Sequence, residues 1–228
     1  DLTNKILGFN PHIIIEPYNE PVNTNFEKLL RNEYKDFTIN KSLNGEAVVM
    51  VNDLAKGILI KGTAKNKKNN SFLTKNLLDG NINDFNKNTI IIGKELAKSL
   101  SVVVGDRINL ISPSYIGTPF GGLPKQEAFF ISAIFDSGFY EFDQNIAFIN
   151  LEDSLLFFEK KKKDLSLEIY LSEPLKADFY KNKIQQINEN YHVYSWTDLN
   201  KSFFGALKIE RNVMFIILTL IIIVAAFN

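Results

Sequence analysis

Two histidines are the side chains of this sequence that could act as a base near neutral pH. His12 and His192 lie in strand-like runs, HIIIEP at 12–17 and YHVYSW at 191–196. A hydrolytic triad would need one of them beside an activated serine, but the sequence holds no G-x-S-x-G turn that would present one. Neither histidine has the spacing of a metal ligand. The sequence therefore predicts no catalytic residue and no metal site at these positions.

Three carboxylates form the second group that could do chemistry. Asp136, Glu141 and Asp143 fall within FDSGFYEFDQN at 135–145. Paired carboxylates can serve as general acid and base, and clustered carboxylates can bind calcium, but this spacing matches no calcium-binding loop. We favour a turn between two strands over either use.

The composition argues against several further classes of function. The chain has no cysteine, which rules out disulfides and thiolate metal sites. Lysine plus arginine and aspartate plus glutamate both number 26, so no overall field would attract nucleic acid or anionic lipid. The sequence lacks a G-x-x-x-x-G-K-S/T loop that could cradle phosphates. We expect neither an enzyme nor a cofactor, and no nucleic-acid partner.

The elements that would position such side chains begin with a unit in the order strand, helix, strand. The strand HIIIEP is followed by TNFEKLLRNEY, whose apolar residues fall on one face of a helix. Thr24 is the expected N-cap, with Glu27 completing a capping box. Residues 37–53 then contain two strand-like segments.

A second unit repeats this order near the other end of the chain. Residues 165–174, LSLEIYLSEP, alternate apolar and polar residues as a half-buried strand does. A helix is expected within 176–190, with Phe179, Ile184 and Ile187 on one face, and YHVYSW closes the unit. Units of this kind can pair into one α+β layer, so we expect 10–55 and 164–200 to form one subdomain.

Residues 56–163, inserted between the two units, carry short β-rich runs and a short helix, KELAKSLSV. Several short strands at close spacing indicate a small barrel or a curled sheet. Gly105 and Asp106 fit a tight turn, in which glycine supplies the positive φ. The five strand candidates are AKGILIKGTA, NTIIIG, DRINLISP, EAFFISAIF and NIAFINL.

Residues 112–126, SPSYIGTPFGGLPKQ, form the most unusual stretch of this insertion. Their three prolines and three glycines are expected to preclude regular strand pairing at the centre. The stretch either folds back over the barrel or forms a protruding hairpin that docks a partner, because exposed apolar residues in loops mark interaction sites. For the lysine run EKKKKD at 159–164, a solvated loop is favoured over a patch for an anionic partner.

Both ends of the chain indicate a membrane. Residues 213–227 are apolar apart from Thr219, and these 15 residues fall short of the roughly 20 that span a bilayer core. We expect a truncated membrane helix, the alternative being a buried C-terminal core helix. Residues 1–9 are expected to end a preceding membrane helix, since Gly8 and Pro11 are typical of a helix end. Lys5, Lys208 and Arg211 are too few to orient the domain.

Four stretches together resemble the permease subunits of the lipoprotein-releasing ABC transporter of Gram-negative bacteria, the LolC/LolE family. The resemblance runs in order along nearly the whole chain. It is carried by ILGFNPHI at 6–13, IIIGKELAKSLSVVVGDRINLISP at 90–113, FDSGFYEFDQNIAFINLED at 135–153 and FFGALKIERNVMFIILTLIIIVAAFN at 203–228.

The resemblance implies an α+β periplasmic domain like that of the macrolide-efflux permeases. A two-segment mixed α/β (porter-like) subdomain, 10–55 and 164–200, would carry the inserted β-rich (sabre-like) subdomain 56–163. Residues 201–228 would be the juxtamembrane region and the start of the second transmembrane helix. The implied location is the bacterial inner membrane, with this domain in the periplasm.

The resemblance also implies partners and site residues. These partners are a cytoplasmic ATPase subunit, a second permease that is the same or a different chain, a lipoprotein substrate and a periplasmic lipoprotein chaperone. The stretch 112–126 occupies the position of the family's chaperone-binding hook, although the extra YIGTPFGG makes it longer than a compact hook. The hook candidates are Ser112, Pro113, Tyr115, Ile116, Pro119, Phe120, Leu123, Pro124 and Gln126, and the candidates for lining a lipoprotein cavity in the membrane are Met214, Phe215 and Leu218.

Two alternatives keep the fold and change the activity. One is an efflux permease of the macrolide type, and the other is a division-associated permease that transports nothing. A fused ATPase domain before the first membrane helix would favour the former, and the absence of chaperone binding would favour the latter.

Overall fold

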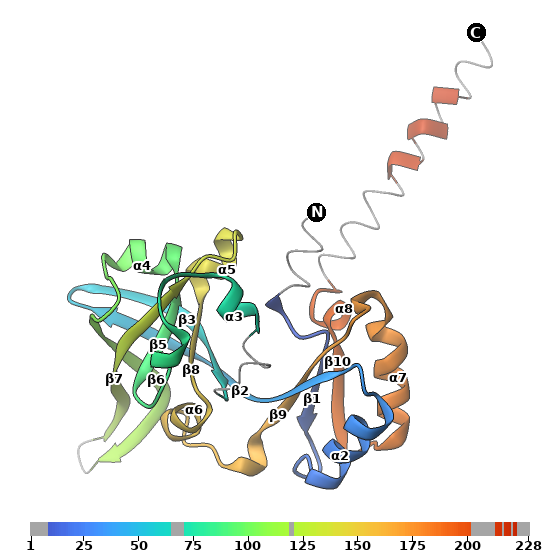
Figure 1. The fold of residues 1–228 in the computed structure, drawn as a ribbon, viewed down its shortest axis with the longest axis horizontal. Helices are drawn as coiled ribbons and strands as arrows, with labels where there is room; N and C mark the ends of the chain where they lie inside the picture. Colours follow the sequence, from blue (N-terminus) through green and yellow to red (C-terminus); the bar gives the residue numbers. More distant parts are fainter. Residues whose placement is uncertain are drawn as a thin grey trace.

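A computed structural model describes residues 9–64, 71–118, 121–201, 213–215, 217–219 and 221–222. For residues 71–72, 114–118 and 121–122 it describes the backbone alone. The described strands form one ten-stranded sheet in the order β10-β1-β9-β2-β3-β8-β5-β7-β4, in which β6 pairs with β2 and β7. Figure 1 shows that this sheet divides into two lobes joined by β2 and β9.

The first lobe, which we call the terminal lobe, combines an early segment of the chain, containing β1 and α2, with a late segment, containing β9, α7, β10 and α8. Strand β1 (Ile13–Pro17) lies between β9 (Ser166–Tyr170) and β10 (Tyr191–Ser195) and pairs antiparallel with both. Helices α2 (Thr24–Glu33) and α7 (Ala177–Ile187) pack with α8 (Trp196–Leu199) around these strands. The pairing predicted for the two strand, helix, strand units is confirmed. Their shared core contains Ile13, Ile15, Phe26, Leu30, Ile39, Leu167, Ile169, Leu171, Ala177, Ile184, Tyr191, Val193 and Trp196.

Three details of these units differ from the sequence-based expectation. The N-cap of α2 is Asn23, whose Oδ1 accepts from the Phe26 amide at 2.7 Å, so the prediction of Thr24 was wrong by one residue. Helix α7 buries Ile184 but leaves Phe179 55% exposed, because the helix meets the sheet along Ala177 instead. The two strand-like segments of 37–53 are one continuous strand, β2 (Thr38–Val51).

Strand β2 is continuous because it belongs to both lobes. Its residues Thr38 to Ser42 pair with β9 of the terminal lobe, and Ser42 to Val51 pair with β3 (Leu54–Thr63) of the other lobe. Strand β2 therefore contributes residues to the hydrophobic cores of both lobes.

The second lobe is a barrel, which is one of the two arrangements that the sequence indicated. Its strands are β2, β3, β8 (Ile146–Asn150), β5 (Thr89–Gly93), β7 (Gly121–Phe135) and β6 (Arg107–Thr118), and each pairs with the next until β6 pairs back with β2. We call it the barrel lobe. The remaining elements are α3 (Ser71–Lys75), β4 (Leu77–Gly80), α4 (Lys94–Leu100), α5 (Tyr140–Asn145), α6 (Leu151–Phe157) and three 3-10 turns at Ile82–Asp84, Lys162–Asp164 and Pro174–Lys176.

Strand alternation divides the apolar residues of this lobe between two cores. Along β5, Ile90 and Ile92 belong to the larger core cluster, while Ile91 belongs to a second cluster with Phe9, Phe135 and Phe148. Successive side chains of a strand point to opposite faces, which explains the division. The tight turn at Gly105 is confirmed, since this glycine has φ +93°.

The two ends of the chain are described only in part. Residues 1–8 lie outside the described residues, and the described parts of 213–222 are helical. Figure 1 shows these helical segments away from both lobes, and their side chains are 46% to 71% exposed, which contradicts the alternative of a buried core helix. None of the helices in the described part of the chain is long and apolar enough to cross a membrane.

Candidate functional site

The stretch 112–126 is a β-hairpin formed by β6 and β7. The two strands pair from Arg107↔Phe130 to Ile111↔Gln126, shift in register, and pair again from Tyr115↔Pro124 to Thr118↔Gly121. The prediction that prolines and glycines would preclude regular pairing was therefore wrong, as was the alternative of a loop folded over the barrel. Pro113 lies within the irregularity and Pro124 borders it, where a missing N–H is tolerated.

The structure sorts the hook candidates into three groups. Pro113, Leu123, Pro124 and Gln126 are exposed, Leu123 to 61%. Ser112 is only 1% exposed, so it offers almost no surface to a partner. Tyr115 and Ile116 lie in β6 and only their backbone is described, whereas Pro119 and Phe120 lie outside the described residues.

The base of the hairpin is tied to the barrel lobe by a lysine. Lys125 Nζ donates to the carbonyl oxygen of Leu156 at the end of α6, and it forms an ion pair with Glu127 Oε1 at 3.0 Å. The Lys125 side chain is 18% exposed, whereas Leu156 is 57% exposed. The hydrogen bond to Leu156 therefore links the base of the hairpin to α6.

An open groove of about 820 Å³ lies beside the hairpin base. Its walls come from β2, β3, the β6–β7 hairpin, α5, the start of β8 and Asn10, which precedes β1. The lining residues are Asn10, Glu46, Ala47, Val48, Gly57, Ile58, Leu59, Ile111, Ser112, Pro113, Pro124, Phe139, Glu141, Phe142, Asn145 and Ile146. Most of these side chains are apolar, and none of the described lining residues is a lysine or an arginine.

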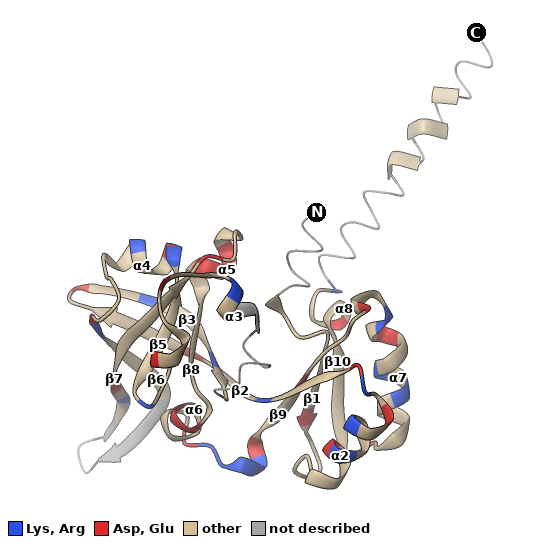
Figure 2. Ribbon diagram, viewed as in Figure 1, with Lys and Arg blue, Asp and Glu red and all other residues tan. Residues whose placement is uncertain are grey.

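The charges around the groove are carboxylates and one nearby lysine. Burial lowers the pKa of Lys56, and the negative charge of Glu141 partly opposes this shift. Glu46 is exposed on β2 at the groove. Figure 2 shows acidic residues at α5 and a run of lysines between α6 and β9, at the lower edge of the molecule. The lysines at 160–163 are all exposed, as expected of a solvated loop.

The acidic group of the sequence braces the turn between β7 and α5. The hydrogen bond from Lys94 Nζ to Asp136 Oδ2, at 2.6 Å, lowers the pKa of Asp136. Burial raises the pKa of Asp143, although the amide and hydroxyl of Ser137 donate to its Oδ1 at 3.0 and 2.5 Å. Among the described residues no cluster of histidine and carboxylates could hold a metal ion.

Both histidines have structural partners. His12 is buried, and its Nδ1 accepts from the Leu171 amide at 2.7 Å. The ring of His192 contacts that of Tyr18, with centroids 4.0 Å apart. His12 therefore links β1 to the residue after β9, and His192 packs at the surface of β10.

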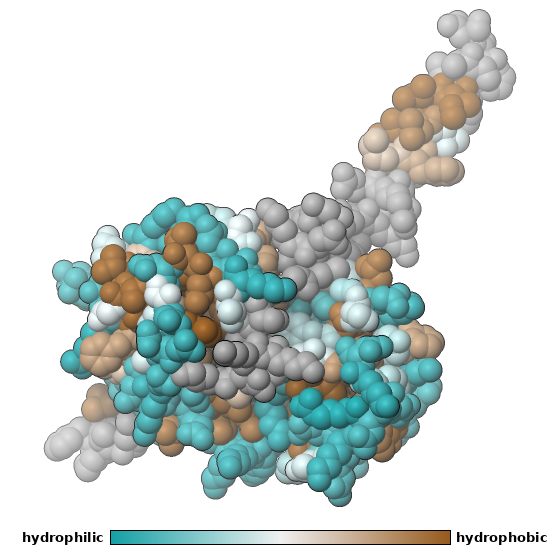
Figure 3. Space-filling view, viewed as in Figure 1, coloured by the Kyte–Doolittle hydropathy of each residue, from teal (hydrophilic) through white to brown (hydrophobic). Residues whose placement is uncertain are grey.

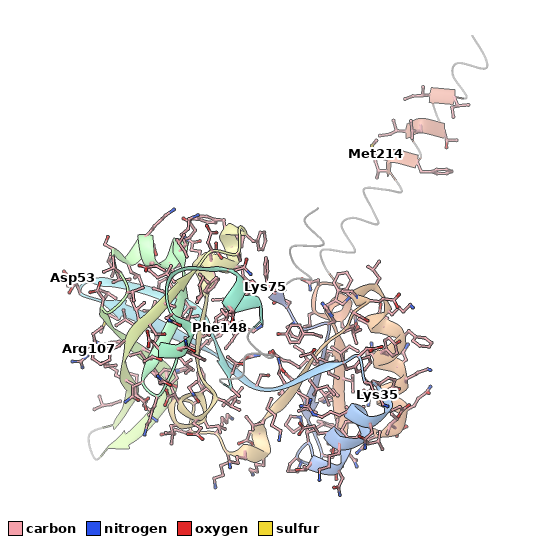
Figure 4. The ribbon with its side chains drawn as sticks, viewed as in Figure 1. Lys35, Asp53, Lys75, Arg107, Phe148 and Met214 are labelled. Atoms are coloured by element: carbon pink, nitrogen blue, oxygen red, sulfur yellow. The ribbon has the colours of Figure 1, made fainter. Side chains whose placement is uncertain are left out.

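The candidates for lining a membrane cavity lie on the C-terminal helical segments. Met214, Phe215 and Leu218 are 53%, 71% and 53% exposed. Figure 4 shows Met214 far from both lobes, whereas Phe148 lies within the barrel lobe. These three candidates therefore lie near one another in sequence on the C-terminal helical segments, and these segments are far from the β6–β7 hairpin.

Comparison with a solved structure identifies the fold. The chain superposes on the periplasmic region of MacB from Actinobacillus actinomycetemcomitans with a TM-score of 0.52 at 8% sequence identity, covering 86% of this chain and 93% of that one. The fold is therefore that of the periplasmic domain of a MacB-type ABC permease.

Comparison with curated sequences identifies the family within this fold. The chain is 31% identical over 239 residues to the lipoprotein-releasing system transmembrane protein LolC of Buchnera aphidicola (subsp. Schizaphis graminum), covering 99% of this chain and 56% of that protein. It is 34% identical over 141 residues to LolC of Neisseria meningitidis, covering 61% of this chain and 34% of that protein. No model of a protein family matches the chain. The resemblance to the LolC/LolE family is confirmed, and the chain spans between a third and about half of the length of these relatives.

Proposed function

We propose that this chain is the periplasmic part of an inner-membrane permease that releases lipoproteins from the membrane and passes them to a periplasmic chaperone. The similarity to LolC along 99% of the chain carries this proposal. ATP would be hydrolysed by a separate cytoplasmic subunit, and a second permease, identical or different, would complete the transporter. The two-segment α/β subdomain, 10–55 and 164–200, would support the inserted subdomain 56–163.

The β6–β7 hairpin is proposed to dock the chaperone. It supplies the exposed apolar side chain of Leu123 and the exposed Pro113 and Pro124, and Lys125 links its base to α6. Exposed apolar residues on paired strands can enter a partner's apolar site at a lower cost in conformational entropy than those of an unpaired loop. Tyr115, Ile116, Pro119 and Phe120 would extend this surface.

The membrane part of the proposal concerns the acyl chains. Met214, Phe215 and Leu218 would line a cavity that receives the lipid anchor. Each buried CH₂ group of an acyl chain contributes about 0.8 kcal/mol to its retention in the membrane. Removing several chains therefore requires both a driven step and an apolar acceptor, which explains why a permease would hold its chaperone close by.

Site-specific photocrosslinking tests the docking role. A photoreactive residue replaces Leu123 in the full-length permease within its transporter, and the same residue replaces Val103 as a matched control. The two positions are 61% and 62% exposed. We expect the periplasmic lipoprotein chaperone to crosslink to position 123 and not to position 103. Equal crosslinking at both positions, or none at either, would overturn the docking assignment.

A further inference from the structure

Strand β3 has a free edge at its N-terminal end. All ten of its residues pair with β2, whereas β8 pairs only with residues 59–63. On the side that faces away from β2, residues 54–58 therefore pair with no strand in the described part of the chain. A free edge of this kind can accept a further strand.

Every second residue of this segment points its backbone groups to the free edge. The turn between β2 and β3 holds two residues, so the alternation of the ladder can be counted from Leu54, whose N–H and C=O groups point to β2. Those of Ala55 and Gly57 therefore point away from β2. None of the hydrogen bonds between described residues uses these groups.

The groove beside the hairpin base reaches this edge. Ile58 lines it although Ile58 is only 4% exposed, and its neighbour Gly57 has no side chain, so this part of the wall is largely backbone. A Cβ built on Gly57 would meet no atom within 4 Å. Helix α5 lines the groove through Glu141, Phe142 and Asn145. The groove thus leaves room beside the unpaired backbone of β3.

The backbone of β3 selects the class of occupant. A hydrocarbon in the groove would shield the N–H and C=O groups of Ala55 and Gly57 from water and give them no partner, which costs free energy. An extended peptide would supply these partners, as an added strand does. Figure 3 shows hydrophobic residues at the surface of both lobes, so apolar exposure alone selects neither the site nor its ligand.

The charges of the groove favour a basic side chain on that peptide. The charged residues of its described lining are Glu46 and Glu141, and neither forms an ion pair with another described residue. Burial lowers the pKa of Lys56 and the charge of Glu141 raises it, so Glu141 has a cation nearby. Glu46 lies opposite Leu59 in the β2–β3 register, close to the free edge. A cation on the peptide would be attracted to Glu46.

We propose that the groove binds an extended segment of another protein, which adds as a strand to the free edge of β3 and carries a basic side chain toward Glu46. Its apolar side chains rest on Val48, Leu59 and Ile146, which line the groove. The edge is long enough for a strand of about five residues. The inference goes beyond the proposed function, because it concerns a second protein contact of the barrel lobe and does not depend on lipoprotein release.

Fluorescence anisotropy with the full-length permease in its transporter tests this site. The probe is a fluorescein-labelled pentapeptide, Val-Thr-Lys-Thr-Val, whose valines and lysine lie on one face of a strand. We expect saturable binding of this probe. The peptide with glutamate in place of lysine should bind at least about tenfold more weakly, because it brings a like charge to Glu46. No binding of the lysine probe, or stronger binding of the glutamate peptide, would overturn the proposal.

Two N-methylated forms of the probe test the addition of a strand. One form carries methyl groups on the valine and lysine amides and the other on the threonine amides, so each loses the N–H groups of one edge. Only the edge that faces β3 needs its donors. One form should therefore bind at least about tenfold more weakly than the other. Equal binding by the two forms would show that side chains alone hold the peptide, contrary to the proposal.

Variants of Gly57 test the same hydrogen bonds from the side of the permease. Gly57→Pro removes the N–H that points to the free edge and should weaken binding of the probe about fivefold or more. Gly57→Ala is the matched control, because it keeps the N–H and its methyl group enters open space. This variant should bind the probe as the wild type does. Equal affinities of the two variants would contradict the proposal.

Glu46→Lys replaces Gly57→Pro if the proline variant fails to fold. The new lysine should reverse the preference, so that the glutamate peptide binds more tightly than the lysine probe. An unchanged preference for the lysine probe would remove Glu46 from the site and overturn the proposal.

A second copy of this chain is the rival occupant. The 228 residues contain no cysteine, so Gly57→Cys places a single thiol at the edge. A disulfide between two copies at position 57, formed without any peptide, would identify the second copy as the occupant and overturn the proposal.

The outcome is separable from that of the docking experiment. If the probe does not bind while position 123 crosslinks to the chaperone, the peptide site is wrong and the docking role stands. If the probe binds as expected but no chaperone crosslinks at position 123, the peptide site stands and the docking role is wrong.

Discussion

The two lobes bury the apolar face of their sheets in different ways. The terminal lobe packs helices α2 and α7 on its strands, and its core is shared between sheet and helices. The barrel lobe closes its sheet on itself and so encloses much of its core between strands. Helices α4, α5 and α6 still add buried residues such as Leu96, Phe142 and Phe157 to the cores of this lobe. The hairpin and the groove are both found on the barrel lobe.

Strand β2 runs from the terminal lobe into the barrel lobe, and a buried ion pair lies at this junction between the lobes. Lys61 of β3 and Glu168 of β9 are each 6% exposed, with Nζ and Oε1 4.0 Å apart. Asn44 Nδ2 and the Tyr170 hydroxyl donate to the Glu168 carboxylate at 2.9 and 3.1 Å. Burial, together with the Glu168 charge, raises the pKa of Tyr170 well above its usual value. The junction is therefore polar, whereas each lobe has an apolar core.

Removing the lysine of this junction should have the largest effect on stability. Lys61→Met leaves the Glu168 carboxylate buried without its counter-charge, which costs about 3–5 kcal/mol in the free energy of unfolding. Urea unfolding measures the loss. Lys35→Met, at an exposed lysine, is the control and should change stability by less than about 0.5 kcal/mol. Adding Glu168→Leu to Lys61→Met should restore part of the loss, and a double variant no more stable than Lys61→Met would contradict this account.

Two glycines of β3 test where the barrel lobe is closely packed and where it is open. A Cβ on Gly62 would lie 2.0 Å from Ser154 Oγ and 2.7 Å from the Leu43 carbonyl oxygen. Gly62→Ala should therefore destabilise the chain by about 1–3 kcal/mol. Gly57→Ala enters open space and should be neutral or slightly stabilising. Equal thermal denaturation temperatures for the two variants would contradict the inferred difference in packing between Gly62 and Gly57.

One carboxylate of each lobe, Asp198 and Asp153, should respond to acid in opposite directions. Burial would raise the pKa of Asp198 in the terminal lobe, but the hydrogen bonds from Lys181 and Ser195, at 2.7 and 3.0 Å, outweigh burial and lower it. In the barrel lobe burial raises the pKa of Asp153, although the Asn88 amide donates to it at 2.7 Å.

The sign of each contribution follows from linkage. Asp198 stabilises the fold above its unfolded pKa, near 3.8, and this stability is lost as the pH falls through its lower folded pKa. The contribution of Asp153 is complete below 3.8 and is lost as the pH rises through its raised folded pKa. The advantage of wild type over Asp198→Asn should therefore shrink on acidification, while that over Asp153→Asn should grow. Urea unfolding from about pH 6 to about pH 3 measures both, and parallel slopes would contradict the prediction.

The smallest expected effect concerns the start of α2 in the terminal lobe. Asn23→Ala removes the side-chain acceptor of the Phe26 amide and should cost about 1 kcal/mol. Thr24→Ala, one residue further, should cost little, because Thr24 is already the first residue of the helix. A larger loss for Thr24→Ala than for Asn23→Ala would restore the sequence-based assignment of the cap.

The local patterns of the sequence determined most of the elements. Alternation in LSLEIYLSEP and the short apolar runs of 56–163 predicted strands that are present, and Gly105 marked a real turn. The family resemblance was also readable, since it resides in contiguous stretches. These features depend on neighbours a few residues apart, so a single sequence contains them.

The tertiary structure alone decided how the strands close into a barrel and where a groove remains on its surface. Pairing of β6 with β2 depends on residues about 60 positions apart. The continuity of β2 follows from pairing with two lobes at once, and the hairpin persists past its prolines because the register shifts beside them. The groove joins Asn10, Gly57, Pro124 and Ile146, four places along the chain. No local pattern records such a meeting, because burial and strand pairing between distant segments create it.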